Sequence, residues 1–318
     1  MKIATISIVV PTKGCVNKCP FCVSRMHDCP YENRWDNIAM TKRIQYAVMN
    51  GVNTCIITGT GEPLQNIEFL NNLTMLFRDM NYPFPNVELQ TTGVFLSEKR
   101  KVPTLIKINE DDDFIYPYIN VLEHLRVNTI SLSVASIFNN KLNSDIIGIN
   151  SNLDFALDKL IIFLKEKGFN VRLSLNMLKN YNDYGVWQII ERCKELKADQ
   201  ITFRKMYQGM AGSAETEWVS KNKCSYETLE KIKTYIEGTE IGTPGIQTPE
   251  TIWHFQKGHG EFLYKLPFGG KVYSIKGMSV VMDDDCMSKE NNEALKYIIL
   301  REDGKLYCRW DDNGSLIF

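Results

Sequence analysis

The chain has 318 residues, of which 44% are hydrophobic and 24% are charged, and its formal net charge is −1. This composition is typical of a globular protein, and the near-zero net charge excludes a field that would draw the whole chain onto nucleic acid or an anionic membrane. No apolar run approaches the ~20 residues that a membrane span requires. Nine cysteines without a disulfide-like framework indicate a reducing, cytoplasmic setting in which thiolates can bind metal.

The first predicted strand is the apolar run Ile3–Val10. It follows Lys2 and so imitates a signal peptide, but the run is short, has no small-residue cleavage site and leads directly into Pro11. We therefore expect a β-strand and no secretory leader.

Three cysteines follow that strand at the spacing C-x3-C-x2-C: Cys15, Cys19 and Cys22. Three thiolates can hold three corners of a [4Fe-4S] cube, which leaves one iron free to bind something else. The alternative is a closed tetrahedral zinc site with Cys29 as the fourth ligand. Structural zinc sites are usually built from two C-x2-C-like pairs, and this segment has one. We therefore favour the cluster and expect Cys29 to be an ordinary loop or core thiol.

A glycine-rich loop follows the second predicted strand. A helix over Thr41–Asn50, with Thr41 as N-cap and Gly51 as C-cap, comes first. The strand itself is the apolar run Cys55–Thr58, and the next residues read Gly59-Thr60-Gly61-Glu62-Pro63. A turn of this composition after a buried strand lets a ligand approach the bare backbone.

The two motifs together resemble the signature of radical S-adenosylmethionine (radical SAM) enzymes. The resemblance implies that the three cysteines hold a [4Fe-4S] cluster, that SAM binds its open iron, and that Phe21 lies beside the adenine of SAM. It also implies that carbonyls and the carboxylate of the glycine-rich loop hold the amino group of SAM's methionine part. The matching residues are Gly59, Thr60, Gly61 and Glu62. Many members have glycine in place of Thr60, so we expect its side chain to point away from the ligand.

The remaining predicted elements continue the alternation of helices and strands. Apolar residues recur at helical spacing three times, and β-branched or apolar runs mark four more strands. The helices are predicted over 67–77, 153–168 and 186–196, and the strands over 87–91, 129–134, 171–175 and 200–204. Strands separated by helices favour right-handed crossovers and a parallel sheet. We therefore predict an α/β fold, and the resemblance implies a partial (β/α)6 TIM-like barrel with a small C-terminal α+β extension.

Further candidate site residues lie where the predicted strands end, because parallel barrels bind ligands at the C-terminal ends of their strands. They are Thr92, Gly93, Ser133, Asn176 and Arg204. The resemblance implies that polar residues on the fourth and fifth strands bind the ribose and carboxylate of SAM, so Ser133, Asn176 and Arg204 are predicted to contact this cofactor. Each has a structural alternative: Ser133 as a hydrogen-bonding group of the barrel interior, Asn176 as a loop cap, and Arg204 in an ion pair with a surface carboxylate. Arg204 could equally face the substrate.

Two stretches lie outside the alternation. Residues 97–119 form a predicted surface insertion with a solvated acidic run. A rise in proline and glycine places a domain boundary at 238. Residues 1–237 are then the barrel core, and residues 238–318 are an extension that we predict to cover the barrel opening.

The predicted extension contains short strands. Residues 296–300 and 305–309 are predicted to form a hairpin through Asp303-Gly304. Together with 273–275 and 279–281 they could make a small antiparallel sheet. Three later cysteines lack paired spacing, so no second cluster is expected; they are Cys224, Cys286 and Cys308.

These features predict a radical SAM enzyme that reductively cleaves SAM to a 5′-deoxyadenosyl radical, which abstracts hydrogen from a small-molecule or peptide substrate. The resemblance also implies an external one-electron donor such as flavodoxin. Residues 59–66 resemble the corresponding segment of radical SAM adenine methyltransferases that act on RNA. Those enzymes need a helical domain before the barrel and two methyl-transfer cysteines, for which only Cys286 or Cys308 could be proposed. That activity and a non-enzymatic iron-sulfur or zinc binding module are the alternatives, and no membrane or nucleic-acid partner is expected.

Overall fold

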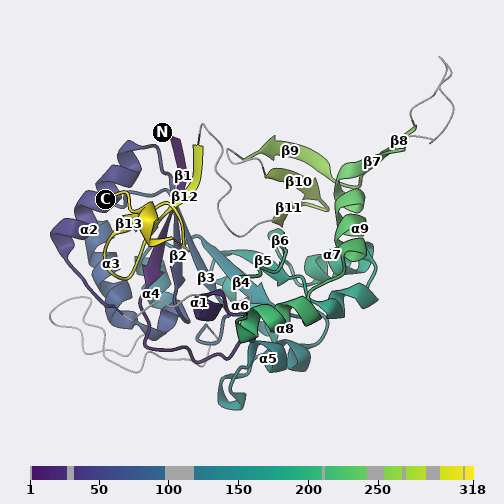
Figure 1. Cartoon of the computed structure of the whole chain (residues 1–318), viewed down its shortest axis with the longest axis horizontal. Helices are drawn as coiled ribbons and strands as arrows, with labels where there is room; N and C mark the ends of the chain where they lie inside the picture. The colour runs from purple at the N-terminus through teal and green to yellow at the C-terminus, as the bar shows by residue number, and fades with distance from the viewer. Residues whose placement is uncertain are drawn as a thin grey trace.

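The computed structural model describes residues 2–26, 32–96, 118–209, 212–241, 254–266, 270–283, 294–310 and 312–318. Within these ranges, one sheet of eleven strands forms the frame of the molecule (Figure 1). In spatial order its strands are β13 (Leu306–Tyr307), β12 (Ala294–Leu300), β1 (Lys2–Val10), β2 (Thr54–Gly59), β3 (Asn86–Thr91), β4 (Thr129–Val134), β5 (Asn170–Asn176), β6 (Gln200–Arg204), β11 (Met278–Asp283), β10 (Lys271–Ile275) and β9 (Glu261–Lys265). A separate pair, β7 (Gly238–Ile241) and β8 (His254–Lys257), projects away from the main body (Figure 1).

The six predicted barrel strands are confirmed. Strands β1 to β6 lie side by side in chain order, and each pairs with the next in parallel. The helices are α1 (Val23–Met26), α2 (Asn37–Met49), α3 (Ile67–Asp79), α4 (Tyr118–His124), α5 (Asn140–Ile147), α6 (Leu157–Glu166), α7 (Val186–Glu195), α8 (Ala214–Asn222) and α9 (Tyr226–Glu237). None of the described helices is long and apolar enough to cross a membrane.

The sheet curls round into an open barrel. Strands β12 and β11 are the first and last strands of the parallel part of the sheet, and seven strand-to-strand spacings separate them. At about 4.8 Å for each spacing, a flat sheet would hold these two strands about 34 Å apart. Lys296 on β12 nevertheless reaches Asp283 on β11, with 3.3 Å between Nζ and Oδ1. In the described residues no strand pairing joins β12 to β11, so side chains rather than a backbone ladder connect the two ends.

Two predicted helix boundaries are wrong. Helix α2 begins at Asn37, because Asp36 is the N-cap and its carboxylate accepts from the Ala39 N–H at 2.8 Å. Thr41 lies inside the helix, where its hydroxyl donates to the Asn37 carbonyl at 2.7 Å. Helix α6 begins at Leu157, and Leu153 belongs to a short 3₁₀ turn before it.

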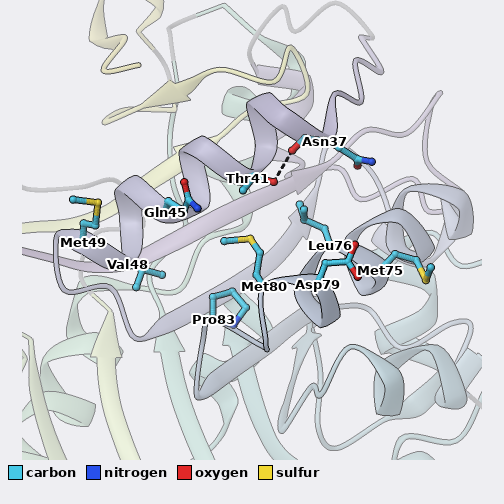
Figure 2. A pocket seen from close by; sticks show the side chains of 10 residues that line it. All are labelled: Asn37, Thr41, Gln45, Val48, Met49, Met75, Leu76, Asp79, Met80 and Pro83. Atoms are coloured by element: carbon cyan, nitrogen blue, oxygen red, sulfur yellow. Dashed lines mark hydrogen bonds between the residues drawn. The ribbon is translucent and has the colours of Figure 1, made fainter.

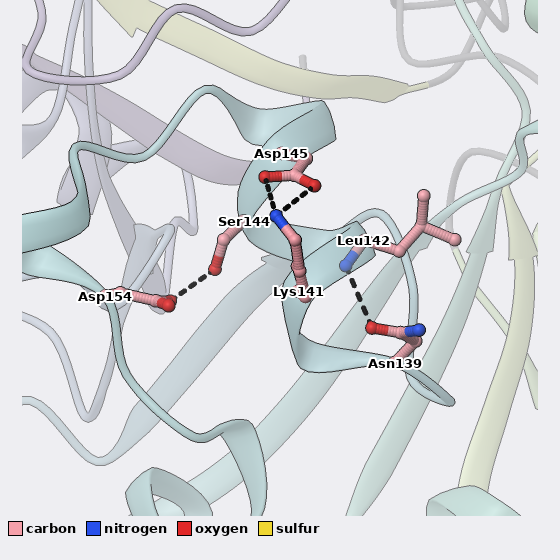
Figure 3. Close-up of polar contacts among 6 residues, drawn as sticks. All are labelled: Asn139, Lys141, Leu142, Ser144, Asp145 and Asp154. Atoms are coloured by element: carbon pink, nitrogen blue, oxygen red, sulfur yellow. Dashed lines mark hydrogen bonds and ion pairs between the residues drawn. The ribbon is translucent and has the colours of Figure 1, made fainter.

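Helix α5 was not expected from the sequence, because its eight residues carry few apolar side chains. Polar side chains at its start and along its length hold it in place instead (Figure 3). The Asn139 side chain accepts from the Leu142 N–H at 3.0 Å, and Gly148 ends the helix with a φ of 68°. Ser144 donates to Asp154, which ties the helix to the segment before α6. The helix therefore presents a fixed C-terminus to the cysteine-bearing loop.

The C-terminal segment extends the main sheet instead of forming a separate antiparallel sheet. Strand β11 pairs in parallel with β6, and β12 pairs in parallel with β1. Both edges of the six-stranded core would otherwise leave a row of unpaired backbone groups. The predicted hairpin is confirmed as β12–β13, and Gly304 in its turn has a φ of 76°. The boundary at 238 stays a prediction, and most of the 97–119 insertion, Cys29 and Cys286 lie outside the described residues.

Candidate functional site

The loop that carries the three cysteines is held down by side chains of the segment that follows β2. The Val16 N–H donates to Gln65 Oε1 at 2.9 Å, and Asn66 Nδ2 donates to the Pro11 carbonyl at 2.7 Å. The Thr12 N–H donates to Thr60 Oγ1 at 3.2 Å. The side chain of Thr60 therefore serves the start of the cysteine loop, which explains how a residue larger than glycine fits there.

The two glycines of the motif allow close approach, Gly61 to the cysteine loop and Gly59 within its own loop. A Cβ atom on Gly61 would lie 2.4 Å from Thr12 Oγ1, 2.7 Å from the Gly14 carbonyl oxygen and 3.1 Å from Cys15 Cβ. A Cβ atom on Gly59 would lie 2.9 Å from the Gly61 carbonyl oxygen. Neither glycine has a positive φ, so close approach and not backbone conformation excludes larger residues here.

Glu62 links the same loop to the end of β3. Its side chain is buried, with Thr91 Oγ1 donating to Oε1 at 2.5 Å and Thr92 donating to Oε2 from both its N–H, at 3.0 Å, and its hydroxyl, at 2.8 Å. Asn17 Nδ2 donates to Thr92 Oγ1 at 2.8 Å, so the cysteine loop is connected too. Burial raises the pKa of Glu62, while these donors act in the opposite direction.

The three cysteines are free thiols at the mouth of the barrel. Cys15 is exposed, and Cys19 and Cys22 are partly buried. Burial raises the pKa of Cys19 to about 12, and the negative charges of Cys22 and Cys15 contribute to the increase. Three thiolates on one loop therefore repel one another until cationic iron compensates them.

The donor set fits an iron-sulfur cluster. In the described part of the chain, no three His, Cys, Asp or Glu side chains converge as the ligands of one metal ion would. A [4Fe-4S] cluster takes a separate thiolate at each iron that the protein ligates, so three sulfurs on a docked loop could hold three of its four irons. The residues that would hold the cluster are Cys15, Cys19 and Cys22.

Phe21 lies in a small apolar cluster against which Cys19 also packs. Its side chain is 8% exposed and belongs to a group with Ala135, Leu178 and Val219. The Trp218 ring lies 5.9 Å from the Phe21 ring, centroid to centroid. We call Phe21, Ala135, Leu178, Trp218 and Val219 the Phe21 cluster. Ala135 follows β4, Leu178 follows β5, and Trp218 and Val219 belong to α8. The cluster therefore lies at the C-terminal ends of the strands. Trp218 and Val219 were not predicted as site residues, because the α8 segment has no periodic pattern of apolar residues.

The other predicted site residues lie together on adjacent strands. Asn176 Nδ2 donates to Ser133 Oγ at 3.0 Å, between β5 and β4. Arg204 on β6 is in register with Asn176. The structure thus brings all three predicted residues to the carboxyl ends of β4, β5 and β6. Thr92 holds Glu62 as described, and a Cβ on Gly93, whose φ is +89°, would lie 2.7 Å from Leu160 Cδ2 and 3.1 Å from Leu132 Cδ2.

A cavity of about 1000 Å³ lies inside the open barrel. Alternate residues of the strands line it, and most of them are polar; they include Ser7, Thr58, Glu88, Gln90, Ser131, Arg172, Ser174, Thr202, Arg204, Ser279, Asp283 and Lys296. The intervening residues, such as Ile57, Leu89 and Leu173, are fully buried in the apolar core. This alternation makes the barrel interior a polar chamber beneath the cysteine loop.

A second hollow of about 850 Å³ lies outside the barrel between α2 and α3 (Figure 2). Its lining is mainly aliphatic and methionine side chains, among them Val48, Met49, Met75 and Met80. It contains none of the predicted site residues. The candidate site is therefore the barrel interior and not this surface.

The sequence matches the Radical SAM superfamily over residues 9–193, and the chain belongs to that superfamily. Its members are enzymes that use a [4Fe-4S] cluster and SAM, which are the cofactors predicted for this chain. Among curated proteins, none matches this sequence.

Several solved structures share part of the fold. The structure of native anSMEcpe with bound AdoMet and Kp18Cys peptide has 15% identity and a TM-score of 0.49, over 72% of this chain and 57% of that chain. Methylornithine synthase (PylB) has 12% identity and a TM-score of 0.45, over 73% of this chain and 62% of that chain. Coproporphyrinogen III oxidase (HemN) from Escherichia coli has 16% identity and a TM-score of 0.40, over 73% and 51%. The matched region thus spans about half to three fifths of each of these proteins.

Proposed function

We propose that this protein holds a [4Fe-4S] cluster through Cys15, Cys19 and Cys22 and binds SAM at the iron that these residues leave open. When bound and reduced, the cluster supplies the electron that cleaves SAM to methionine and a 5′-deoxyadenosyl radical, which takes a hydrogen atom from the substrate. The substrate is a small molecule or a peptide side chain that enters the polar chamber.

The observation that carries this proposal is the docking of the cysteine loop on the loop after β2. Gly61 leaves no room for a side chain between them, and Gln65 and Asn66 fix the backbone on either side. Fixing a loop in this way defines where its sulfur atoms lie before iron arrives, which lowers the entropy cost of cluster binding.

Chain residues have separate tasks in the proposal. The Phe21 cluster takes the adenine, Ser133 and Asn176 take the ribose and carboxylate, and the carbonyls of Gly59 to Gly61 accept from the amino group of SAM. Glu62 already accepts from Thr91 and Thr92, and the Leu64 N–H is a further donor, so its part is to orient the loop whose carbonyls receive that amino group. The chamber excludes bulk water from the radical.

An anaerobic assay tests the proposal. The protein is reconstituted with iron and sulfide, reduced with dithionite and incubated with SAM, and 5′-deoxyadenosine is quantified. The wild type is expected to form 5′-deoxyadenosine, Cys19→Ala to form none, and Cys308→Ala, which removes a partly buried thiol outside the loop, to match the wild type. Wild-type protein that holds a full complement of cluster iron and yet leaves SAM intact would show that the proposed reaction is wrong. The external electron donor, which we propose to be a flavodoxin-like protein, is then sought by replacing dithionite.

A further inference from the structure

Four polar side chains form a continuous row across the wall of the chamber. Gln90 on β3 is in register with Ser131 on β4. Ser131 is in register with Arg172 on β5, and Arg172 with Gln200 on β6. Residues in register on neighbouring strands are about 4.8 Å apart and share a face of the sheet, and all four of these line the cavity. We call this row the polar belt.

The polar belt lies away from the predicted SAM site, toward the N-terminal ends of the strands. Arg172 precedes Asn176 by four residues on β5, and Ser131 precedes Ser133 by two on β4. At about 3.3 Å a residue, the belt is about 7 to 13 Å from these SAM residues along the strands. A substrate held in the belt by one end can therefore present its other end to SAM.

The positive charge of the belt is already neutralised. Arg172 contacts Glu88 with 2.5 Å between Nη1 and Oε2, and the Glu88 side chain is only 7% exposed. A carboxylate brought to the belt would be repelled by Glu88, and an ammonium group would be repelled by Arg172. The belt therefore favours an uncharged group, because an ionised one would lose its water without gaining a free counter-charge.

The ion pair also fixes which way the two glutamine side chains face. Gln90 Nε2 donates to Glu88 Oε1 at 3.3 Å, which leaves the Gln90 carbonyl oxygen as an acceptor. Arg172 Nε donates to Gln200 Oε1 at 2.7 Å, which leaves the Gln200 amide nitrogen as a donor. Arg172 uses two of its five guanidinium donors in its contacts with Glu88 and Gln200, and the other three have no partner among the described residues.

Ser131 lies on the strand between the acceptor and the donors. The residue is 3% exposed, and its hydroxyl has no hydrogen-bond partner within the described ranges. A buried hydroxyl without a partner costs free energy, and a ligand in the chamber would supply the missing hydrogen bond. The belt thus presents an acceptor on β3, a hydroxyl on β4 and donors on β5 and β6.

The geometry points to the polar belt as the binding site for an amide group of the substrate, a carboxamide or a lactam. Such a group is uncharged and carries a carbonyl acceptor beside an N–H donor. Its carbonyl accepts from Arg172 and Gln200, its N–H donates to Gln90, and Ser131 bonds to either. The chamber of about 1000 Å³ admits a small-molecule amide or a peptide segment. This inference rests on the proposed function, because it places the substrate next to SAM in the same barrel.

Ligand-observed NMR titration of the reconstituted, oxidised protein, with and without SAM, tests the inference. The probes are acetamide, acetate and acetamidinium, which share one shape and differ in charge, and N-methylacetamide as a model of the peptide group. The wild type is expected to bind acetamide about tenfold or more tightly than acetate or acetamidinium. N-methylacetamide as the tighter amide would indicate a peptide substrate, and acetamide as the tighter one a primary amide.

Variants separate the belt from the general polarity of the chamber. Ser131→Ala is expected to weaken acetamide binding about fivefold, the effect of one hydrogen bond. Ser7→Ala removes a buried hydroxyl from β1 in the wall of the same cavity and is expected to bind acetamide as the wild type does. Glu88→Gln removes the charge that compensates Arg172, so acetate is expected to become the tighter ligand.

Four outcomes would overturn the inference. They are absent acetamide binding to the wild type, an ionic probe that binds the wild type as tightly as acetamide, an equal loss of affinity in Ser7→Ala and Ser131→Ala, and displacement of acetamide by SAM. Melting temperatures identify a variant that does not fold, and the preference of the wild type among the probes decides in that case. Formation of 5′-deoxyadenosine by the wild type is measured in the same preparation, so a failure of the proposed function is recognised separately.

Discussion

Gly61→Ala tests whether close contact between the two loops places the cysteines. The new Cβ would lie 2.7 Å from the Gly14 carbonyl oxygen and 3.1 Å from Cys15 Cβ. A backbone oxygen cannot rotate away as a flexible side chain can, so the cysteine loop must move by several tenths of an ångström or more. Overpacking of this kind costs about 1–3 kcal/mol. We expect the melting temperature to fall and, more importantly, the iron bound per chain after reconstitution to fall as well.

A matched control separates lost stability from loop displacement. Gly168 has a φ of 86° with nothing within 4 Å of its virtual Cβ, so Gly168→Ala introduces strain of about 1–2 kcal/mol far from the cysteines. This variant should melt earlier yet bind as much iron as the wild type. The reasoning would be refuted if Gly61→Ala took up the wild-type amount of iron and formed 5′-deoxyadenosine at the wild-type rate.

Three further predictions concern the surroundings of the site. Asn66→Asp keeps the N-cap of α3, where the side chain accepts from the Phe69 N–H at 3.0 Å, but it loses the donation to the Pro11 carbonyl. The variant should keep the stability of the wild type and lose iron faster on dilution. Equal retention of iron would contradict the role of this contact. Trp218→Ala opens the Phe21 cluster and should raise the Kd of SAM about tenfold, from a loss of about 1–1.5 kcal/mol of aromatic contact, with no change in iron content; an unchanged Kd would place the adenine elsewhere. The side chains of Lys296 and Asp283 are 18% and 20% exposed, and Lys296→Met leaves the Asp283 carboxylate without this partner. The variant should lower the free energy of unfolding by about 1 kcal/mol in chemical unfolding. The reasoning fails if the double variant Lys296→Met/Asp283→Leu is destabilised as much as the single one.

The barrel strands were predictable because each is a local run with its own signal. Ile3–Val10 and Thr129–Val134, for example, are apolar or β-branched and stand between turn residues or helical patterns. The places of β11 and β12 were not predictable in this way. Their partners, β6 and β1, are distant in sequence, and nothing in a short hairpin shows which sheet edge it will complete.

The candidate site could be predicted where its residues form a continuous motif. The residues that hold this motif in place from other parts of the chain could not be predicted. Gly59, Gly61 and Glu62 are adjacent in the sequence, and the structure assigns each a contact. Gln65, Asn17 and Thr91 carry no motif by themselves, because a polar residue in a loop has many partners available. Only the folded chain shows that Gln65 accepts from Val16 and that Thr91 binds Glu62.

The most direct test of the central claim is the electron paramagnetic resonance spectrum of the dithionite-reduced protein, recorded anaerobically before and after SAM is added. Three cysteines that leave one iron open predict the spectrum of a reduced [4Fe-4S] cluster whose g-values shift when SAM binds, and no such cluster in Cys19→Ala. A spectrum that SAM leaves unchanged, or zinc in place of iron on the N-terminal thiols, would contradict the account.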